Sequence, residues 1–458
     1  MNKFAPIFSV LTFLLSVTGA GVSQAADNGL PKYAAEPCCQ LCPEAQKTSA
    51  EVALKEGSAG WLFAATERAT NAEPLTTPER AFLLKLLVQE LAQKGTTVML
   101  VMPPSRTLMY ADHQLSKGAA AETTKEYLQT LSFFRQAGFL VPAYERLQPT
   151  VSGSAEPFFF KRDIHWTSSG AMQTAQLAAA DIRKLALFEH QPEQRFETTA
   201  QGVLKISGLL NNQSQTLCGG QRYPLEFTPH FVTKAVDEAT TTSADDIWLI
   251  GSSQSVENRF NFNGFLQQSL SRKVSNYTPD DGNSSVGWTK LLASEAFQTK
   301  PPKLILWELP YEHRKLSASQ LRQMIALVNN GCESYPTLEQ KTQVFKGNNL
   351  NDVIFGANLL KTHPSQLIFD LKLSDPSIEQ LLLTVWYSDG GKSDFQIRKN
   401  SQLTDSGRFS FVLGNVEMRQ PRFFVSLDLA LPGAARGKTT INASVCHFPD
   451  NLLQTAGR

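Results

Sequence analysis

Two residues that can perform acid–base chemistry stand two positions apart in the segment FFFKRDIHWTSSGA, residues 158–171. Asp163 and His165 offer a carboxylate and an imidazole, which form the acid–base half of a Ser-His-Asp triad if a serine reaches them. The candidate serine is Ser253, in the segment WLIGSSQS at the end of an apolar run. Ser253 would then be the nucleophile, His165 its base and Asp163 the group that fixes the imidazole tautomer.

Each segment also has a simpler interpretation. Gly-Ser-Ser after a strand commonly forms only a turn, and GSSQS departs from the G-x-S-x-G pattern of a nucleophile elbow. Asp163 and His165 could instead form a helix cap with a surface histidine, or supply two metal ligands, although no further His/Asp cluster lies nearby in the sequence to complete a metal site. We expect no metal and no cofactor. In the triad interpretation, the backbone N–H groups of Ser253 and Gln254 face the developing oxyanion.

The segments that position these residues alternate between helical and buried-strand patterns. Thr77-Pro78 is expected to begin a helix that ends at Gly95, because threonine caps helices and proline suits their first position. We expect further helices over 123–137, 167–187, 262–271, 287–297 and 317–331, and strands over 60–63, 97–102, 139–141, 247–250 and 303–307. This alternation predicts an α/β domain with a mainly parallel sheet.

Ligands of such sheets bind beyond the carboxyl ends of the strands. Ser253 and the loop Pro103–Arg106 both follow expected strands. Arg106 is therefore a candidate contact for a substrate carboxylate. His313, which also follows a strand, is expected to line the cleft without being catalytic.

The pattern changes after about residue 340. Short apolar runs at 366–371, 380–386, 408–413 and 423–429 alternate with Asp, Gly, Ser and Pro turns. This alternation of short apolar runs and turns predicts a small β-sandwich. We therefore expect a catalytic domain over 26–340 and a β-sandwich module over 341–458.

The N-terminus is typical of a secretory signal. Lys3 precedes an apolar core from Phe4 to Val17, and small residues favour cleavage after Ala25. No later segment approaches the roughly 20 apolar residues of a transmembrane helix. The net charge of +1 argues against a generally basic nucleic-acid binder. An exported protein without a membrane span is predicted.

The cysteines fit an oxidising compartment. A zinc or redox motif is the alternative for the cluster Cys38, Cys39 and Cys42, but export favours structural disulfides. One of these three is expected to pair with Cys218 while the other two pair together. Cys332 and Cys446 are expected to form the remaining bridge.

These motifs together resemble the AlgX/AlgJ family of alginate O-acetyltransferases, most closely its AlgX members. The resemblance rests on Asp-x-His followed by Thr-Ser-x-Gly, on a strand ending in Gly-Ser-Ser-x-Ser, and on the Cys-Cys-x-x-Cys-Pro arm. It implies an SGNH-hydrolase-like domain with a permuted triad order, in which Asp163, His165 and Ser253 act as acid, base and nucleophile. Ser252 stands where the family commonly has threonine.

One feature of the resemblance does not transfer. The family has a tyrosine shortly after the nucleophile that helps to form the oxyanion hole, whereas this chain has Glu257-Asn258-Arg259-Phe260. Asn258 or Arg259 could take that role, or both could be ordinary loop residues, which is the interpretation we favour.

The resemblance implies a periplasmic O-acetyltransferase that acts on alginate mannuronate residues. It also implies that membrane-associated acetylation proteins supply the acetyl donor and that proteins of an alginate secretion complex are the partners. The C-terminal module would bind the polyanion, with Arg398, Lys399 and Arg408 as the expected contacts because cations pair with uronate carboxylates. Trp386 or Tyr387 could stack on a sugar, although Trp386 is expected in the core. A polysaccharide acetyl esterase and a non-catalytic alginate-binding scaffold are the alternatives.

Overall fold

The computed structural model describes residues 41–447 except 44, 46–52, 65–66, 68–76, 115–118, 148–155, 190–191, 221–222, 237–244, 257, 315, 346–348, 400–406, 414–421 and 432–438. The expected signal segment and its cleavage site at Ala25 lie outside the described residues, as do Cys38 and Cys39. Among the residues that are described, no helix is both long and apolar enough to cross a membrane.

The centre of the first part of the chain is a parallel sheet in the order β3-β8-β6-β7. Its strands are β3 Thr97–Val101, β6 Ile247–Ile250, β7 Ser275–Asn276 and β8 Leu304–Glu308. The strand expected over 139–141 is reduced to a parallel bridge between Leu140 and Met99. The predicted mainly parallel sheet is therefore confirmed.

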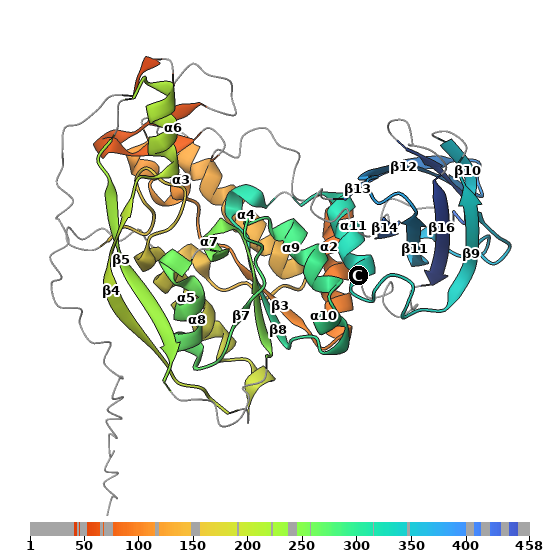
Figure 1. Cartoon of the computed structure of the whole chain (residues 1–458), viewed down its shortest axis with the longest axis horizontal. Helices are drawn as coiled ribbons and strands as arrows, with labels where there is room; N and C mark the ends of the chain where they lie inside the picture. Colours follow the sequence, from red (N-terminus) through yellow and green to blue (C-terminus); the bar gives the residue numbers. More distant parts are fainter. Residues whose placement is uncertain are drawn as a thin grey trace, which may run out of the picture. The chain divides into compact units, whose positions relative to one another are not determined.

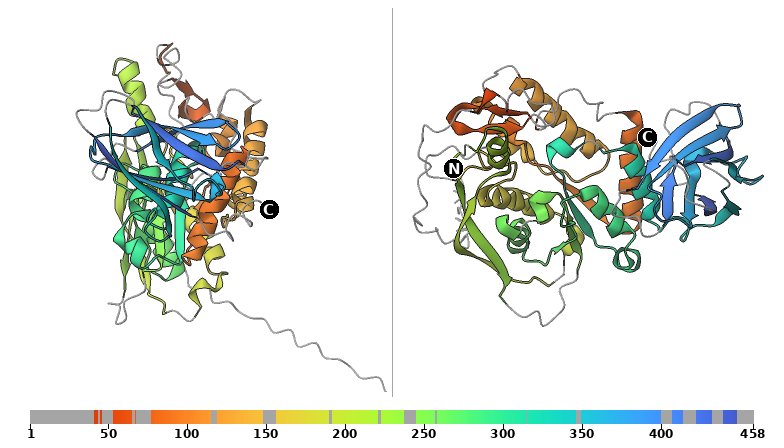
Figure 2. Two further views of the ribbon diagram at one scale, coloured as in Figure 1. Left: turned by 90° about the vertical axis from the view of Figure 1, so that its right-hand side faces the viewer. Right: turned by 45° about the horizontal axis from the view of Figure 1, so that its top comes forward.

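Alternate residues of the sheet pack against two different helical layers, because successive strand side chains point to opposite faces. Val98 and Leu100 of β3 share one buried cluster with the first layer, whose helices are α2 Pro78–Gln93, α4 Ala119–Gln136, α9 Ser284–Leu292 and α11 Ala318–Leu327. Met99 and Val101 share another with α5 Ser168–Ile182 and α8 Phe262–Leu270. Figures 1 and 2 show the strands between these helices.

Short polar side chains set the ends of these helices. Thr77 caps α2, with its hydroxyl accepting a hydrogen bond from the Arg80 N–H at 3.3 Å. Ser317 and Gln320 form a reciprocal capping box at the start of α11. Ser294 caps a separate short helix, α10 Glu295–Thr299, and so divides the helix that the sequence predicted over 287–297.

An antiparallel ribbon that the sequence did not predict stands beside α8 (Figure 1). It consists of β4 Phe196–Ile206 and β5 Glu226–Ala235, joined through α6 Leu209–Leu217. A disulfide between Cys42 and Cys218 fixes the end of α6 to the N-terminal arm. The remaining short elements of this part are β1 Leu54–Glu56, β2 Leu62–Ala64, α3 Arg106–Met109 and α7 Ser253–Val256.

The C-terminal part is a sandwich of two four-stranded antiparallel sheets, ordered β10-β15-β12-β13 and β14-β11-β16-β9. The strands are β9 Thr337–Val344, β10 Asn349–Phe355, β11 Leu367–Leu373, β12 Gln380–Tyr387, β13 Lys392–Arg398, β14 Arg408–Val412, β15 Phe424–Ala430 and β16 Thr440–His447. The predicted β-sandwich is confirmed. The domain boundary expected at 340/341 falls within β9, so we place the start of this module before Thr337.

Buried contacts tie α11 to the sandwich. Arg322 of α11 is 2% exposed, donates hydrogen bonds to the carbonyls of Val412 and Leu413, and pairs with Glu79 of α2 at 2.5 Å. The expected disulfide between Cys332 and Cys446 is present. The Arg322 guanidinium thus donates hydrogen bonds to backbone carbonyls of the sandwich and pairs with a carboxylate of the α/β part at the same time.

Replacement of Arg322 by methionine should destabilise the protein by about 3 kcal/mol, because it leaves two buried carbonyls and a carboxylate without their donor. Urea denaturation followed by tryptophan fluorescence measures this loss. Arg398→Met is the control, since it removes an exposed guanidinium and should change stability by less than about 0.5 kcal/mol. Equal midpoints for the two variants would contradict a stabilising role for Arg322.

Candidate active site

The structure brings the three predicted triad residues together. The Nε2 atom of His165 lies 3.0 Å from the Ser253 hydroxyl oxygen, and its Nδ1 atom lies 2.5 Å from Oδ1 of Asp163. Ser253 begins α7 directly after β6, at the carboxyl end of the parallel sheet. A base in contact with both a serine and an orienting carboxylate is the arrangement that activates a hydroxyl nucleophile.

The carboxylate of Asp163 is buried and held in its charged form. Burial alone would raise its pKa, but the His165 side chain and the backbone N–H groups of His165 and Leu209 donate to it and lower the pKa below the ordinary value. The Leu209 N–H, at 2.7 Å from Oδ2, belongs to the first turn of α6. The positive end of that helix therefore faces the acid.

A buried carboxylate beneath the nucleophile fixes the turn from β6 into α7. Glu308, 1% exposed at the end of β8, accepts hydrogen bonds from the Ser252 N–H at 2.7 Å and from the hydroxyls of Ser252 and Ser255. Burial raises the pKa of Glu308, and these hydrogen bonds oppose the rise. A Cβ on Gly251 would lie 2.6 Å from Oε2 of Glu308, so the turn can pack on this carboxylate only with glycine there.

The surroundings of the two expected oxyanion donors differ. The Gln254 N–H donates to the Ser252 hydroxyl at 3.2 Å, which directs it into the protein. The Ser253 N–H lies against Gly282, whose φ is +68° and whose added Cβ would approach that nitrogen to 2.4 Å. Space beside the Ser253 N–H therefore exists because residue 282 is glycine. Asn258 and Arg259 are exposed on the 3₁₀ turn Asn258–Phe260.

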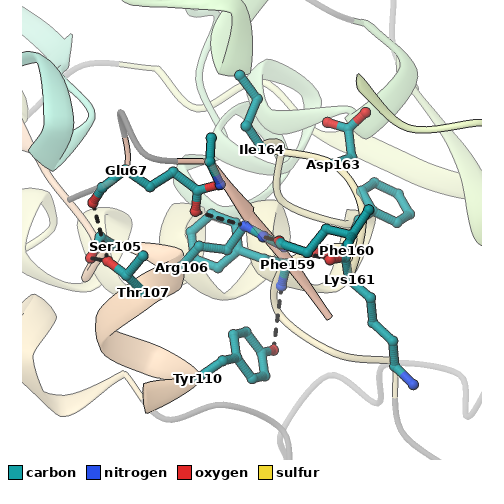
Figure 3. Close-up of polar contacts among 12 residues, drawn as sticks. Glu67, Ser105, Arg106, Thr107, Tyr110, Phe159, Phe160, Lys161, Asp163 and Ile164 are labelled. Carbon is teal, nitrogen blue, oxygen red and sulfur yellow. Dashed lines mark hydrogen bonds and ion pairs between the residues drawn. The ribbon is translucent and has the colours of Figure 1, made fainter. Parts of the chain in front are cut away.

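The segment that carries the acid and base depends on buried side chains for its backbone hydrogen bonds (Figure 3). Tyr110 accepts from the N–H groups of Phe158 and Phe159, and Glu226 accepts from those of Lys161 and Arg162. Arg106 donates to the carbonyls of Phe160 and Lys161 and, across the loop, to Leu62. Glu67 balances its charge at 3.1 Å.

The interpretation of Arg106 as a substrate contact is therefore wrong. Its side chain is 2% exposed, and the backbone carbonyls and Glu67 occupy its donors. Arg106 supports the loop of Asp163 and His165 from behind. His313, by contrast, is exposed on the 3₁₀ turn Tyr311–His313.

The three expected glycan contacts lie in different environments. Arg398 is exposed at the end of β13, where it donates to the Gln380 side chain. Lys399 is only 6% exposed, with its ammonium 4.1 Å from the centre of the Phe409 ring. Arg408 pairs with Asp370 at 2.5 Å and also donates to Asn330. Lys399 is therefore buried, and the guanidinium of Arg408, 24% exposed, is already engaged by Asp370 and Asn330.

The expectation for Trp386 is also corrected. Its side chain is 37% exposed on the outer face of β12, whereas that of Tyr387 is buried. Beside Trp386 lies a groove of about 500 Å³ whose lining residues include Asn349, Asn351, Thr384, Asp394, Gln396 and Asp428. The Trp386 indole donates to Asp428 at 2.7 Å, which joins the ring to this groove.

Substitution of Gly282 by alanine should abolish most hydrolysis of a chromogenic acetyl ester, because the new methyl group would collide with the backbone of Ser253. Gly95→Ala is a matched control. Its φ is +78°, so it carries the same backbone strain of about 1–2 kcal/mol, but a Cβ there meets nothing within 4 Å. Equal activities per folded molecule for both variants would show that the space beside Ser253 is not needed.

Known proteins share this architecture. A family model described as "SGNH hydrolase-like domain, acetyltransferase AlgX" matches residues 54–311, and a second, described as "C-terminal carbohydrate-binding module", matches 331–456. The alginate biosynthesis protein AlgX of Pseudomonas syringae pv. tomato is 30% identical, over 96% of this chain and 95% of that protein. The probable alginate O-acetylase AlgJ of Pseudomonas aeruginosa is 27% identical, over 59% of this chain and 72% of that protein.

A solved structure agrees with both matches. The structure of Pseudomonas aeruginosa AlgX superposes with a TM-score of 0.71 at 27% identity and covers 89% of this chain and 100% of that chain. The sequence, the domain order and the fold therefore all agree, and the chain belongs to the AlgX/AlgJ family, with AlgX as its nearer branch.

Proposed function

We propose that the protein is an O-acetyltransferase that transfers acetyl groups to hydroxyls of alginate through Ser253, His165 and Asp163. The observation that carries the proposal is the position of His165, whose two ring nitrogens lie within hydrogen-bonding distance of the serine hydroxyl and of the carboxylate. We propose alginate as the substrate because the relatives are named for alginate biosynthesis and alginate O-acetylation.

The mechanism has two halves. The Ser253 oxygen attacks the acetyl carbonyl carbon while His165 Nε2 takes the hydroxyl proton, and the tetrahedral intermediate then expels the donor's leaving group, which receives that proton. A mannuronate hydroxyl next attacks the acetyl-serine and gives its proton to His165. Collapse of the second intermediate releases the acetylated sugar and returns the proton to Ser253.

The compartment proposed for this reaction is the periplasm. Two disulfides, Cys42–Cys218 and Cys332–Cys446, fit an extracytoplasmic, oxidising environment. The acetyl donor would come from membrane-associated acetylation proteins, and an alginate secretion complex would take the product.

We propose that the polysaccharide lies along the outer face of β12 and β13. Trp386 offers an exposed ring there, and Lys392 and Arg398 place cations at the two ends of β13. Six residues of strand separate these cations by about 20 Å, which fits an oligomer rather than one sugar. Of the three cations that the sequence proposed, only Arg398 remains in this site. The carboxylates on this face are already engaged, since Asp394 accepts from Thr384 and pairs with Lys392 at 3.3 Å, and Asp428 accepts from Trp386. A uronate carboxylate would therefore compete with Asp394 for Lys392, whereas, among the residues that the structure describes, Arg398 makes no ion pair with the carboxylates of this face.

Ser253→Ala should lower acetyl transfer to mannuronate oligomers by at least about 10³-fold, because the variant lacks the hydroxyl that would form the acyl-enzyme. Mass spectrometry of oligomers incubated with a chromogenic acetyl ester counts the acetyl groups. Ser132→Ala, on α4, is the control. If the wild-type protein hydrolyses the ester but never acetylates the oligomer, it is an esterase; transfer that survives Ser253→Ala refutes the nucleophile.

Trp386→Ala should weaken oligomannuronate binding about tenfold, which corresponds to about 1.4 kcal/mol, while ester hydrolysis stays unchanged. Isothermal titration calorimetry measures the affinity. Leu360→Ala is the control, because Leu360 is 47% exposed in the same module but lies outside β12 and β13. An unchanged affinity in Trp386→Ala would place the glycan elsewhere.

A further inference from the structure

Gln254, the residue directly after the proposed nucleophile, contacts the loop that carries the base. Its Oε1 atom accepts a hydrogen bond from the Trp166 N–H at 3.0 Å, and its Nε2 group donates to the Ile164 carbonyl at 3.1 Å. These two backbone groups flank His165 in the chain. The side chain is 8% exposed, so water competes little for either bond.

The other end of Gln254 is equally fixed. Its N–H donates to the Ser252 hydroxyl, and Ser252 is held by Glu308 through its own N–H and hydroxyl. The amide of Gln254 thus forms a short link between the turn that presents Ser253 and the loop that presents His165. These segments are 88 residues apart in sequence, and neither belongs to a strand ladder that would set their separation.

We infer that Gln254 is a positioning residue that sets the distance between His165 Nε2 and Ser253 Oγ. It touches no reacting atom and acts through the backbone on either side of His165. The inference rests on the proposed function, because it assigns Gln254 a role in the same triad. It concerns one geometric quantity of that triad, the distance between the base and the serine hydroxyl.

The chemistry of the link requires one acceptor and one donor in a fixed order. The Trp166 N–H must face an oxygen, and the Ile164 carbonyl must face an N–H or O–H. An amide satisfies both. A carboxylate has two acceptors and repels the Ile164 carbonyl, whereas a protonated carboxylic acid again offers one acceptor and one donor.

Gln254→Glu therefore makes positioning depend on pH. Burial and the facing carbonyl raise the pKa of the new carboxyl group above its ordinary value of about 4.3. The neutral acid, which restores both hydrogen bonds, prevails below that raised pKa, and positioning is lost as pH rises through it. The charged or titratable side chains on the surrounding segments include Lys161, Arg162, Asp163 and His165 on the loop, Glu308 on β8 and Arg259 after α7.

The test measures how fast phenylmethylsulfonyl fluoride labels Ser253 in the full mature protein between pH 5 and pH 8. In this reaction the serine oxygen bonds to sulfur, fluoride leaves and His165 takes the proton. Each rate is divided by the wild-type rate at the same pH, so that any pH dependence common to all variants cancels. Gln254→Leu, which can make neither hydrogen bond, is the second variant. Gln323→Glu is the matched control, because Gln323 is also 8% exposed but lies on α11.

At pH 8 both Gln254 variants should label about 100-fold more slowly than the wild type, since a base displaced by about 1 Å loses that much rate. The relative rate of Gln254→Glu should then rise at least tenfold toward pH 5, while that of Gln254→Leu stays low and that of Gln323→Glu stays near one.

Relative rates near one for both Gln254 variants, or the same pH profile for Gln254→Glu and Gln254→Leu, would overturn the inference. A wild-type protein that is not labelled at Ser253 would instead refute the proposed function, so the two failures are distinguishable.

Discussion

The candidate site depends on one constraint, the need to satisfy the backbone of residues 158–166, which has isolated backbone partners such as the Leu62 N–H and the bridge Phe159–Trp166 but no ladder to any described strand. A buried N–H or carbonyl without a partner costs about 1–3 kcal/mol. Here buried side chains supply the hydrogen bonds that a neighbouring strand would otherwise make. Tyr110 and Glu226 accept from four N–H groups, and Arg106 donates to two carbonyls. Gln254 accepts from one further N–H group and donates to one further carbonyl. The loop can hold Asp163 and His165 rigidly because these side chains come from elements that the core already fixes.

This arrangement explains why several ionisable groups are buried around the candidate site. Arg106 and Glu67 form a pair with little exposure, which is tolerable only because the guanidinium also donates to several carbonyls. Burial raises the pKa of Glu226 and of Glu308, and hydrogen bonds from the backbone oppose that rise in both. Their function here is geometric, because each carboxylate determines the course of a turn next to the triad.

The sequence predicted those features that local chemistry determines. The caps at Thr77 and Ser317, the buried strands and the Asp-x-His and Gly-Ser-Ser motifs each depend on a few neighbouring residues. The partnerships of Glu308 with Ser252 and of Gln254 with Ile164 join residues 56 and 90 positions apart, and no periodicity indicates them. The same holds for the ribbon of β4 and β5, whose mostly exposed or half-buried residues lack a clear apolar alternation.

The errors over side-chain direction have a physical origin as well. The strand-end rule located Arg106 correctly at the edge of the sheet but could not show that its side chain turns inward, toward Glu67. In β12, the sequence QLLLTVWY has apolar residues on both faces, so alternation does not decide between Trp386 and Tyr387. The strand pairing does, because it places Leu383, Val385 and Tyr387 together in the sandwich core.

The junction between α11 and the sandwich also has a consequence for how the chain can be divided. Leu321 and Ile325 of α11 belong to the same buried cluster as Ile368, Val412 and Cys446. The β module therefore forms part of the wall of the α/β core. A protein shortened before Thr337 would expose that apolar wall to water and would tend to self-associate. The two parts are thus separate in architecture, each with a buried cluster of its own, but they share the cluster that contains α11.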